Sequence, residues 1–126
     1  MFNIKIKHVL DKIEPSGGSR IMVDSKVPSG YDEYKLHIDM WAREALPSER
    51  ALRLLKETKD WNKFEEMYFP ELDKEKDFVI QMVVEKAKLG PITLLYNSDD
   101  RKYNNAVAMR DYLISRERRL LGEEAA

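Results

Sequence analysis

The stretch GPITLLYNSDD, residues 90–100, gives the clearest indication of the architecture. A short, mostly apolar run from Ile92 to Tyr96 follows a Gly-Pro pair and is closed by four polar residues. Because these flanking residues are turn formers, the run has a defined beginning and end. Near-continuous apolar character over so few residues is typical of a strand buried on both faces, as in a parallel sheet covered by helices. We therefore predict a buried strand from Ile92 to Tyr96.

Two further strands are predicted nearer the start of the chain. The run from Arg20 to Asp24 is another short apolar segment, and it follows the turn-forming loop EPSGGS at 14–19. Between Ile4 and Val9, apolar residues alternate with lysines, which indicates a strand with one wet face at a sheet edge. We expect the strands at 20–24 and 92–96 to be adjacent and parallel. Residues 36–40 alternate more weakly and fit either a strand or an irregular lead into a helix.

Helical spacing of apolar residues fills most of the remaining chain. We predict helices at 49–57 with Ser48 as cap, at 61–69 with Asp60 as cap, at 78–89 and at 105–121. Pro70, Gly90 in a left-handed conformation and Gly122 are expected to end the last three. The charged run ELDKEKD, 71–77, is expected to be a connection in which Asp77 caps the third helix, and the aromatic stripe at 61–69 is expected to be core.

Strands alternating with helices indicate one α/β domain over residues 1–126, with a small, mainly parallel sheet flanked by helices. The composition agrees with a single core, since 126 residues with 43% hydrophobic content fold as one unit. Lys and Arg total 22 against 23 for Asp and Glu, so no overall field attracts nucleic acid. Arg116, Arg118 and Arg119 are interspersed with glutamates and lack an aromatic platform, which also argues against nucleic acid.

Cysteine is absent, which excludes disulfides, thiolate metal sites and cysteine nucleophiles. No apolar run reaches the length of a membrane span, and the start lacks the apolar core of a signal peptide. We therefore expect a cytoplasmic protein with no membrane partner. Abundant charge of both signs and a single glutamine, Gln81, further suggest a prokaryotic source, with thermophilic character as a weaker expectation.

Ligands of α/β folds bind beyond the carboxyl ends of the strands, where loops and helix N-termini meet. The loops that follow the strands at 20–24 and 92–96 are the two that qualify. Their polar side chains, with those at the start of the last helix, form a candidate pocket for a small anionic ligand. The candidate ligand-binding residues are Asp24, Ser25, Lys26, Ser29, Tyr96, Asn97, Asp100, Asn104 and Arg110.

Each polar group in this set has a structural alternative to a role in binding. Asp24, Asp99 and Asp100 could hold Mg²⁺ or perform acid–base chemistry. We favour the interpretation that Asp24 and Asp100 cap loops or pair with a cation and that Asp99 is solvated. Asn104 and the asparagine after it precede a helix, where one amide acts as the N-cap and an anion could also bind. Arg110 falls among apolar helix positions, so either its stem packs there while the guanidinium reaches solvent, or the guanidinium is buried against a carboxylate. Of these alternatives, we predict a pair with Asp24 or Asp100.

Other chemistry-bearing patterns are missing. His8 and His37 lie far apart without acidic residues at metal-ligand spacing, so both are interpreted as strand residues and no metal site is predicted. No GxGxxG, P-loop or GxSxG motif is present, and Gly17-Gly18-Ser19 is a turn because it precedes a strand. The cofactor, the catalytic residues and the oligomeric state are therefore left open.

Four segments in order resemble the YeaO-like family of uncharacterised small proteins, domain of unknown function 488. They are RIMVDSKVPSG (20–30), MWAREALPSE (40–49), WNKFEEMYFPEL (61–72) and GPITLLYNSDDRKYNNAVAMRDYL (90–113). The family motifs that correspond to the first, second and fourth of these segments read VDRLWPRG, LWLKELAPS and GPVTLLYAARDxxHNxAVVLxEYL. The resemblance covers most of the chain and implies the fold and a pocket rather than a reaction.

This chain departs from the family pattern mainly at polar positions. Ser25 and Ser29 stand where the family usually has arginines, Asp99 replaces a basic residue, and Tyr103 stands for a histidine. Val27 replaces a tryptophan. Because serine cannot supply the bidentate fork of arginine, the resemblance implies a member that has lost its anion-binding groups. The favoured hypothesis is a ligand-binding or regulatory module with a degenerate polar pocket, and the alternative is a small enzyme acting on a phosphate- or carboxylate-bearing metabolite.

Overall fold

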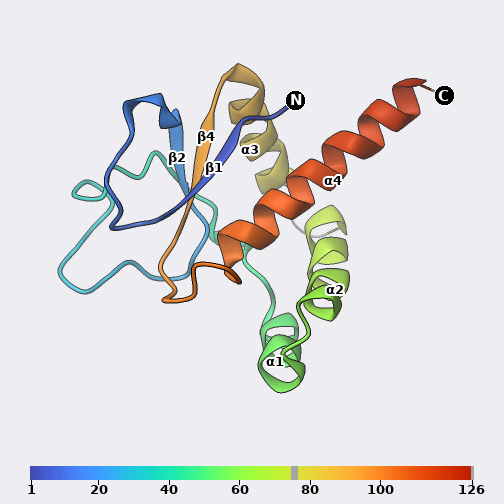
Figure 1. The fold of residues 1–126 in the computed structure, drawn as a ribbon, viewed down its shortest axis with the longest axis horizontal. Coiled ribbons are helices and arrows are strands. Elements are labelled where there is room, and N and C mark those ends of the chain that lie inside the picture. Colours follow the sequence, from blue (N-terminus) through green and yellow to red (C-terminus); the bar gives the residue numbers. More distant parts are fainter. Residues whose placement is uncertain (75–76, 126) are drawn as a thin grey trace.

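The computed structural model describes residues 1–74 and 77–125. Four strands form one sheet, β1 (Ile4–His8), β2 (Ser19–Met22), β3 (Met40–Trp41) and β4 (Ile92–Tyr96). The helices are α1 (Glu49–Thr58), α2 (Trp61–Lys74), α3 (Asp77–Leu89) and α4 (Asn105–Ala125), with short 3-10 turns at Pro15–Gly17 and Arg43–Ala45. Figure 1 shows α4 crossing beside the sheet, with α1 and α2 as a helical pair apart from it.

All strand pairs are parallel, and the order in the sheet is β1-β4-β2-β3. The predicted adjacency of β2 and β4 is confirmed, with Ile21 paired to Leu94. Every residue of β4 is buried, as its apolar run indicated. β1 lies at an edge, as its alternating lysines predicted, and its register pairs Ile4 with Ile92 and His8 with Tyr96.

The helices pack against the sheet and against one another, and their buried side chains form one main core. The inward side of α3 contributes Ile80 and Val83, and that of α4 contributes Met109 and Leu113, all fully buried. α4 contacts both β4 and β1, while α2 contacts α1 and α3. Among the described residues, no helix has the length and apolar character needed to cross a membrane.

The aromatic stripe of α2 is core, as predicted, and it continues beyond the helix. Phe64 and Tyr68 are buried, and the Tyr68 hydroxyl donates a hydrogen bond to the Ala45 carbonyl. Successive ring centroids lie between 5.1 and 6.4 Å apart along a path of six rings. The path runs Tyr103, Trp61, Phe64, Tyr68, Phe69, Tyr112, and so links the loop before α4 to the middle of α4 through α2.

The predicted ends of α2 and α4 are wrong, whereas α3 ends at Leu89 as predicted. α2 continues through Pro70 to Lys74, because Pro70 is exposed and water can reach the carbonyl it leaves unpaired, while Leu72 in the following turn is fully buried. Residues 71–74 of the expected connection therefore belong to α2, and residues 75–76 and the side chain of Asp77 lie outside the described part. Gly90 is not left-handed, since Pro91 restricts the residue before it to extended conformations. Gly122 is exposed and lies inside α4, which continues to Ala125.

The segment before β3 is irregular, and a buried arginine holds it. Arg20 is 6% exposed and donates from Nη2 to the Leu36 carbonyl at 2.9 Å and from Nε to the His37 carbonyl at 3.1 Å. Its backbone N–H donates to Asp39 Oδ2 at 2.8 Å. His37 has a φ of 53°, so the prediction that it is a strand residue is wrong. Of the two alternatives for residues 36–40, the irregular lead is correct, with only Met40 reaching the sheet.

Candidate functional site

The loops that follow β2 and β4 are joined by the carboxylate of Asp24. Its Oδ2 accepts a hydrogen bond from the Asn97 backbone N–H at 2.9 Å, and its Oδ1 accepts one from the Ser25 N–H at 3.0 Å. The Asn97 side-chain amide donates back to the Lys26 carbonyl at 3.0 Å. Both carboxylate oxygens of Asp24 therefore bind loop backbone, which agrees with the capping interpretation.

Asp100 and Asn104 organise the approach to α4. Asp100 Oδ1 accepts hydrogen bonds from the N–H groups of Tyr103 and Lys102, each at 2.9 Å, and these two bonds lower the pKa of Asp100. Asn104 is buried and is the N-cap, because its Oδ1 accepts from the Val107 N–H at 3.0 Å. Its amide nitrogen donates to the Asp100 carbonyl at 2.9 Å. The asparagine side chain is thus fully engaged in capping.

A cavity of about 290 Å³ lies at these strand ends. Three of the sequence-predicted residues line it, Asp24, Ser25 and Asn104, together with Asn105. Its remaining wall was not anticipated, because it comes from the approach to α1, from α1 and α2, and from the loop before α4. That wall consists of Leu46, Pro47, Leu52, Leu55, Trp61, Ser98 and Tyr103.

The other predicted residues do not line this cavity. Lys26 and Ser29 are exposed on the loop after β2. Tyr96 is 2% exposed and packs edge-on against the His8 ring, with centroids 5.4 Å apart. Asn97 binds the neighbouring loop, as described above. The sequence located the two loops, and in the structure the side chains of Asp24 and Asn97 hold those loops together.

The prediction for Arg110 is wrong. Its guanidinium lies 3.7 Å from Asp111 Oδ1, its neighbour in sequence, and its side chain is 40% exposed. No ion pair with Asp24 or Asp100 is found in the described part of the chain. The buried side of α4 is centred on Met109. Arg110 lies at the margin of that side, where its guanidinium reaches solvent.

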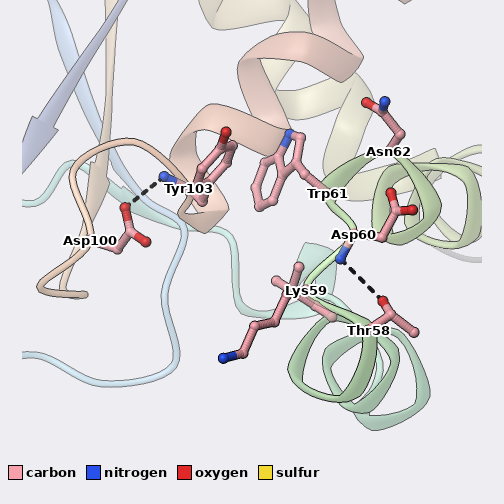
Figure 2. A pocket seen from close by; sticks show the side chains of 8 residues that line it. Thr58, Lys59, Asp60, Trp61, Asn62, Asp100 and Tyr103 are labelled. Carbon is pink, nitrogen blue, oxygen red and sulfur yellow. Dashed lines mark hydrogen bonds between the residues drawn. The ribbon is translucent and has the colours of Figure 1, made fainter.

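A second, wider hollow of about 750 Å³ adjoins the cavity and shares Leu55, Trp61 and Tyr103 with it. It lies between the α1–α2 junction and the loop before α4, and Figure 2 shows Trp61 and Tyr103 side by side above Lys59. Its other lining residues are Thr58, Asp60, Asn62 and Asp100. No local sequence pattern indicates this hollow, because its walls come from residues 55–62 and residues 100–103, some forty residues apart along the chain.

Within the residues that the structure describes, no group of three or more His, Asp or Glu side chains could hold a metal ion. His8 lies in β1, where its Nδ1 accepts a hydrogen bond from the Leu10 N–H at 3.1 Å. Asp99 is exposed and takes no part in the hydrogen bonds that Asp24 and Asp100 accept. The three aspartates therefore do not form one cluster at the strand ends.

The most perturbed carboxyl lies away from the strand ends, between α2 and α4. Burial, followed by a hydrogen bond with Asp111 and the negative charge of Asp111, raises the pKa of Glu65 to about 8. Its Oε2 is buried and finds no hydrogen-bond partner among the described residues. Glu65 is therefore protonated in the folded protein at neutral pH, whereas the unfolded chain ionises near the ordinary pKa of 4.5.

This difference predicts a pH-dependent stability. A raised folded-state pKa stabilises the protein below the unfolded value of 4.5, and the contribution is lost as pH rises toward about 8. Because Glu65 is only half-buried, we expect the loss to be about 1–2 kcal/mol rather than the full value of the shift. Urea unfolding of Glu65→Gln should show a flatter profile between pH 5 and 8.5 than the native chain. Parallel profiles would contradict this assignment, and Glu66→Gln, an exposed neighbour, is the control.

A family model and a known protein that match this chain point to the same family. Residues 3–125 match the family model DUF488-N3i, described as the inactive DUF488-N3 subclade. The chain belongs to this family. It is also 34% identical over 114 residues to the uncharacterized protein YeaO of Escherichia coli (strain K12), covering 90% of this chain and 98% of that protein. The resemblance seen in the sequence is thereby confirmed. No solved structure matches the chain significantly.

Ser25 and Ser29 stand where the YeaO-like pattern usually has arginines. Ser25 lies in the wall of the 290 Å³ cavity, whereas Ser29 is exposed outside it. Tyr103, which stands where the YeaO-like pattern usually has histidine, packs against Trp61 with ring centroids 5.3 Å apart. The ring of Tyr103 thus contacts Trp61 at the position where the resemblance implied a histidine.

Proposed function

We propose that the protein is a non-catalytic ligand-binding module whose site is the cavity at the carboxyl ends of β2 and β4. The observation that carries the proposal is the state of the polar side chains there. Asp24 and Asn104, which line the cavity, use both of their polar ends in holding the loops and capping α4. Catalysis requires a nucleophile, acid or base that is free to reach a substrate. The description of the family as inactive supports the same conclusion.

The cavity wall indicates the kind of ligand. Its residues include no lysine or arginine, and its one charged side chain is the carboxylate of Asp24. Part of the wall is apolar, through Leu46, Leu52 and Leu55, and the rest includes serine and asparagine side chains. A small uncharged ligand with an apolar body and a hydrogen-bonding edge fits this wall better than an anion does. The alternative of an enzyme acting on an anionic metabolite lacks a cation in the wall to support it.

Titration with benzamide, followed through backbone amide resonances, tests the proposal. Benzamide has a flat apolar ring and an amide edge, so we expect saturable shifts at Ser25, Ser98 and Asn105. Benzoate has the same shape with a negative charge, and we expect it to bind at least about threefold more weakly because of Asp24. An absence of saturable shifts with benzamide, or tighter binding of benzoate, would refute the proposal.

Two serine substitutions on one loop make a matched pair. Ser25→Phe places a ring in the cavity wall and should abolish the benzamide shifts. Ser29→Phe adds the same ring to an exposed position outside the cavity and should leave binding unchanged. Equal loss in both variants would show that the shifts arise elsewhere on the loop.

A further inference from the structure

The 750 Å³ hollow between the α1–α2 junction and the loop before α4 has a lining unlike that of the neighbouring cavity. Its ceiling is the ring pair of Trp61 and Tyr103, whose centroids are 5.3 Å apart at an interplanar angle of 47°. Tyr103 is 46% exposed, so an aromatic surface is left open at the protein surface. Packing around an aromatic side chain normally hides such a surface, and its exposure inside a hollow makes it available to a ligand.

Carboxylates lie on two sides of this ring pair. Figure 2 shows Asp100 on the side of the loop before α4 and Asp60 on the side of α2, with the rings between them. Each carboxylate uses Oδ1 to cap backbone N–H groups, Asp60 that of Lys63 and Asp100 those of Lys102 and Tyr103. Among the described residues, neither Oδ2 has a hydrogen-bond donor. The two acids outnumber Lys59, the one cation in the lining.

The chain itself shows that a cation is attracted to this aromatic surface. The ammonium of Lys102 lies 5.2 Å from the centroid of the Tyr103 ring, within the range of cation–π attraction. Lys102 does not line the hollow, so it contacts the ring without filling the space beneath the ring pair. Aromatic faces flanked by carboxylates are the combination that binds alkylated ammonium groups in proteins, because both components attract positive charge.

We infer that the hollow is a binding site for a small organic cation, with the alkylated ammonium group held under Trp61 and Tyr103 and between Asp60 and Asp100. This site is separate from the proposed strand-end site, although the two share a wall. The inference stands whether or not the strand-end cavity binds a ligand, because Asp60 and Asp100 do not line that cavity and Asp24 does not line this hollow.

Titration with tetramethylammonium chloride tests the inference, with sodium chloride at matched concentration as the ionic control. We expect saturable shifts of the Trp61 indole N–H and of the Tyr103 backbone amide, and none with sodium chloride. Asp60→Asn and Asp100→Asn keep the capping oxygen while removing the charge, so both should fold and bind about threefold more weakly. Lys102→Gln removes the competing ammonium and should bind about twofold to threefold more tightly.

Asp99→Asn is the matched control, because it removes an exposed charge from the same loop without touching the hollow. Its affinity should equal that of the native chain. Non-saturable shifts, or shifts that sodium chloride reproduces, would overturn the inference. So would an Asp99→Asn effect as large as that of Asp100→Asn, because binding would then reflect the general charge of the loop.

Discussion

Gly18→Ala is expected to lower the free energy of unfolding by about 3–5 kcal/mol, the largest effect of any substitution considered for this protein. Gly18 has a φ of 67°, where a side chain is strained by about 1–2 kcal/mol. A Cβ there would lie 1.8 Å from the Pro91 carbonyl oxygen and 2.6 Å from its carbon. Because both are backbone atoms at the entrance to β4, relief of the clash would require β2 and β4 to separate.

Gly30→Ala is the matched control for this substitution. Gly30 also has a positive φ, 87°, but a Cβ there would meet nothing within 4 Å. Only the conformational cost remains, so a loss of about 1–2 kcal/mol is expected. Urea unfolding followed by circular dichroism measures both variants. Equal losses would show that the close approach to Pro91 does not limit the fold.

Arg20→Met is expected to cost about 2–4 kcal/mol and to release the segment before β3. The guanidinium is buried and supplies hydrogen bonds to the Leu36 and His37 carbonyls, and bonds from charged donors are the stronger kind. Methionine fills similar apolar space but leaves both carbonyls without these donors. Amide resonances of residues 36–41 should shift or broaden, while those of β1 should change little.

Arg20→Lys separates loss of hydrogen bonding from loss of charge. A lysine ammonium keeps the charge but lacks the planar fork that reaches two carbonyls together. We expect a stability between those of the native chain and Arg20→Met. A native-like stability in Arg20→Met would contradict the assigned role of the guanidinium, and hydrogen exchange at Asp39 and Met40 would confirm or exclude local release.

The strands were predictable because burial on both faces leaves a local signature. The apolar run at Ile92–Tyr96 marked the buried centre of the sheet, and the lysines at 5 and 7 marked an edge. Helix ends were less predictable. Pro70 could remain inside α2 because Leu72 anchors the turn beyond it, and such anchoring depends on tertiary packing that periodicity does not record.

The candidate site was predictable in position but only partly in composition. Rules for parallel sheets placed it beyond β2 and β4, and Asp24, Ser25 and Asn104 line the cavity there. Its apolar wall depends on how α1 docks, which no local pattern states. Arg110 was misplaced because it neighbours apolar positions on the helix yet lies at the edge of the buried side, and helical spacing alone cannot fix that edge to within one residue.

The central claim is that the strand-end cavity retains the family frame without the groups that bind anions. Titration of the native chain and of Ser25→Arg/Ser29→Arg with inorganic phosphate, followed through backbone amide resonances, tests it most directly. The native chain should show no saturable shifts at residues 24–30 and 97–105. The double variant should gain them, because its guanidinium groups supply bidentate donors that serine lacks. Saturable phosphate binding by the native chain at these residues would contradict the claim and favour an enzyme acting on an anionic metabolite.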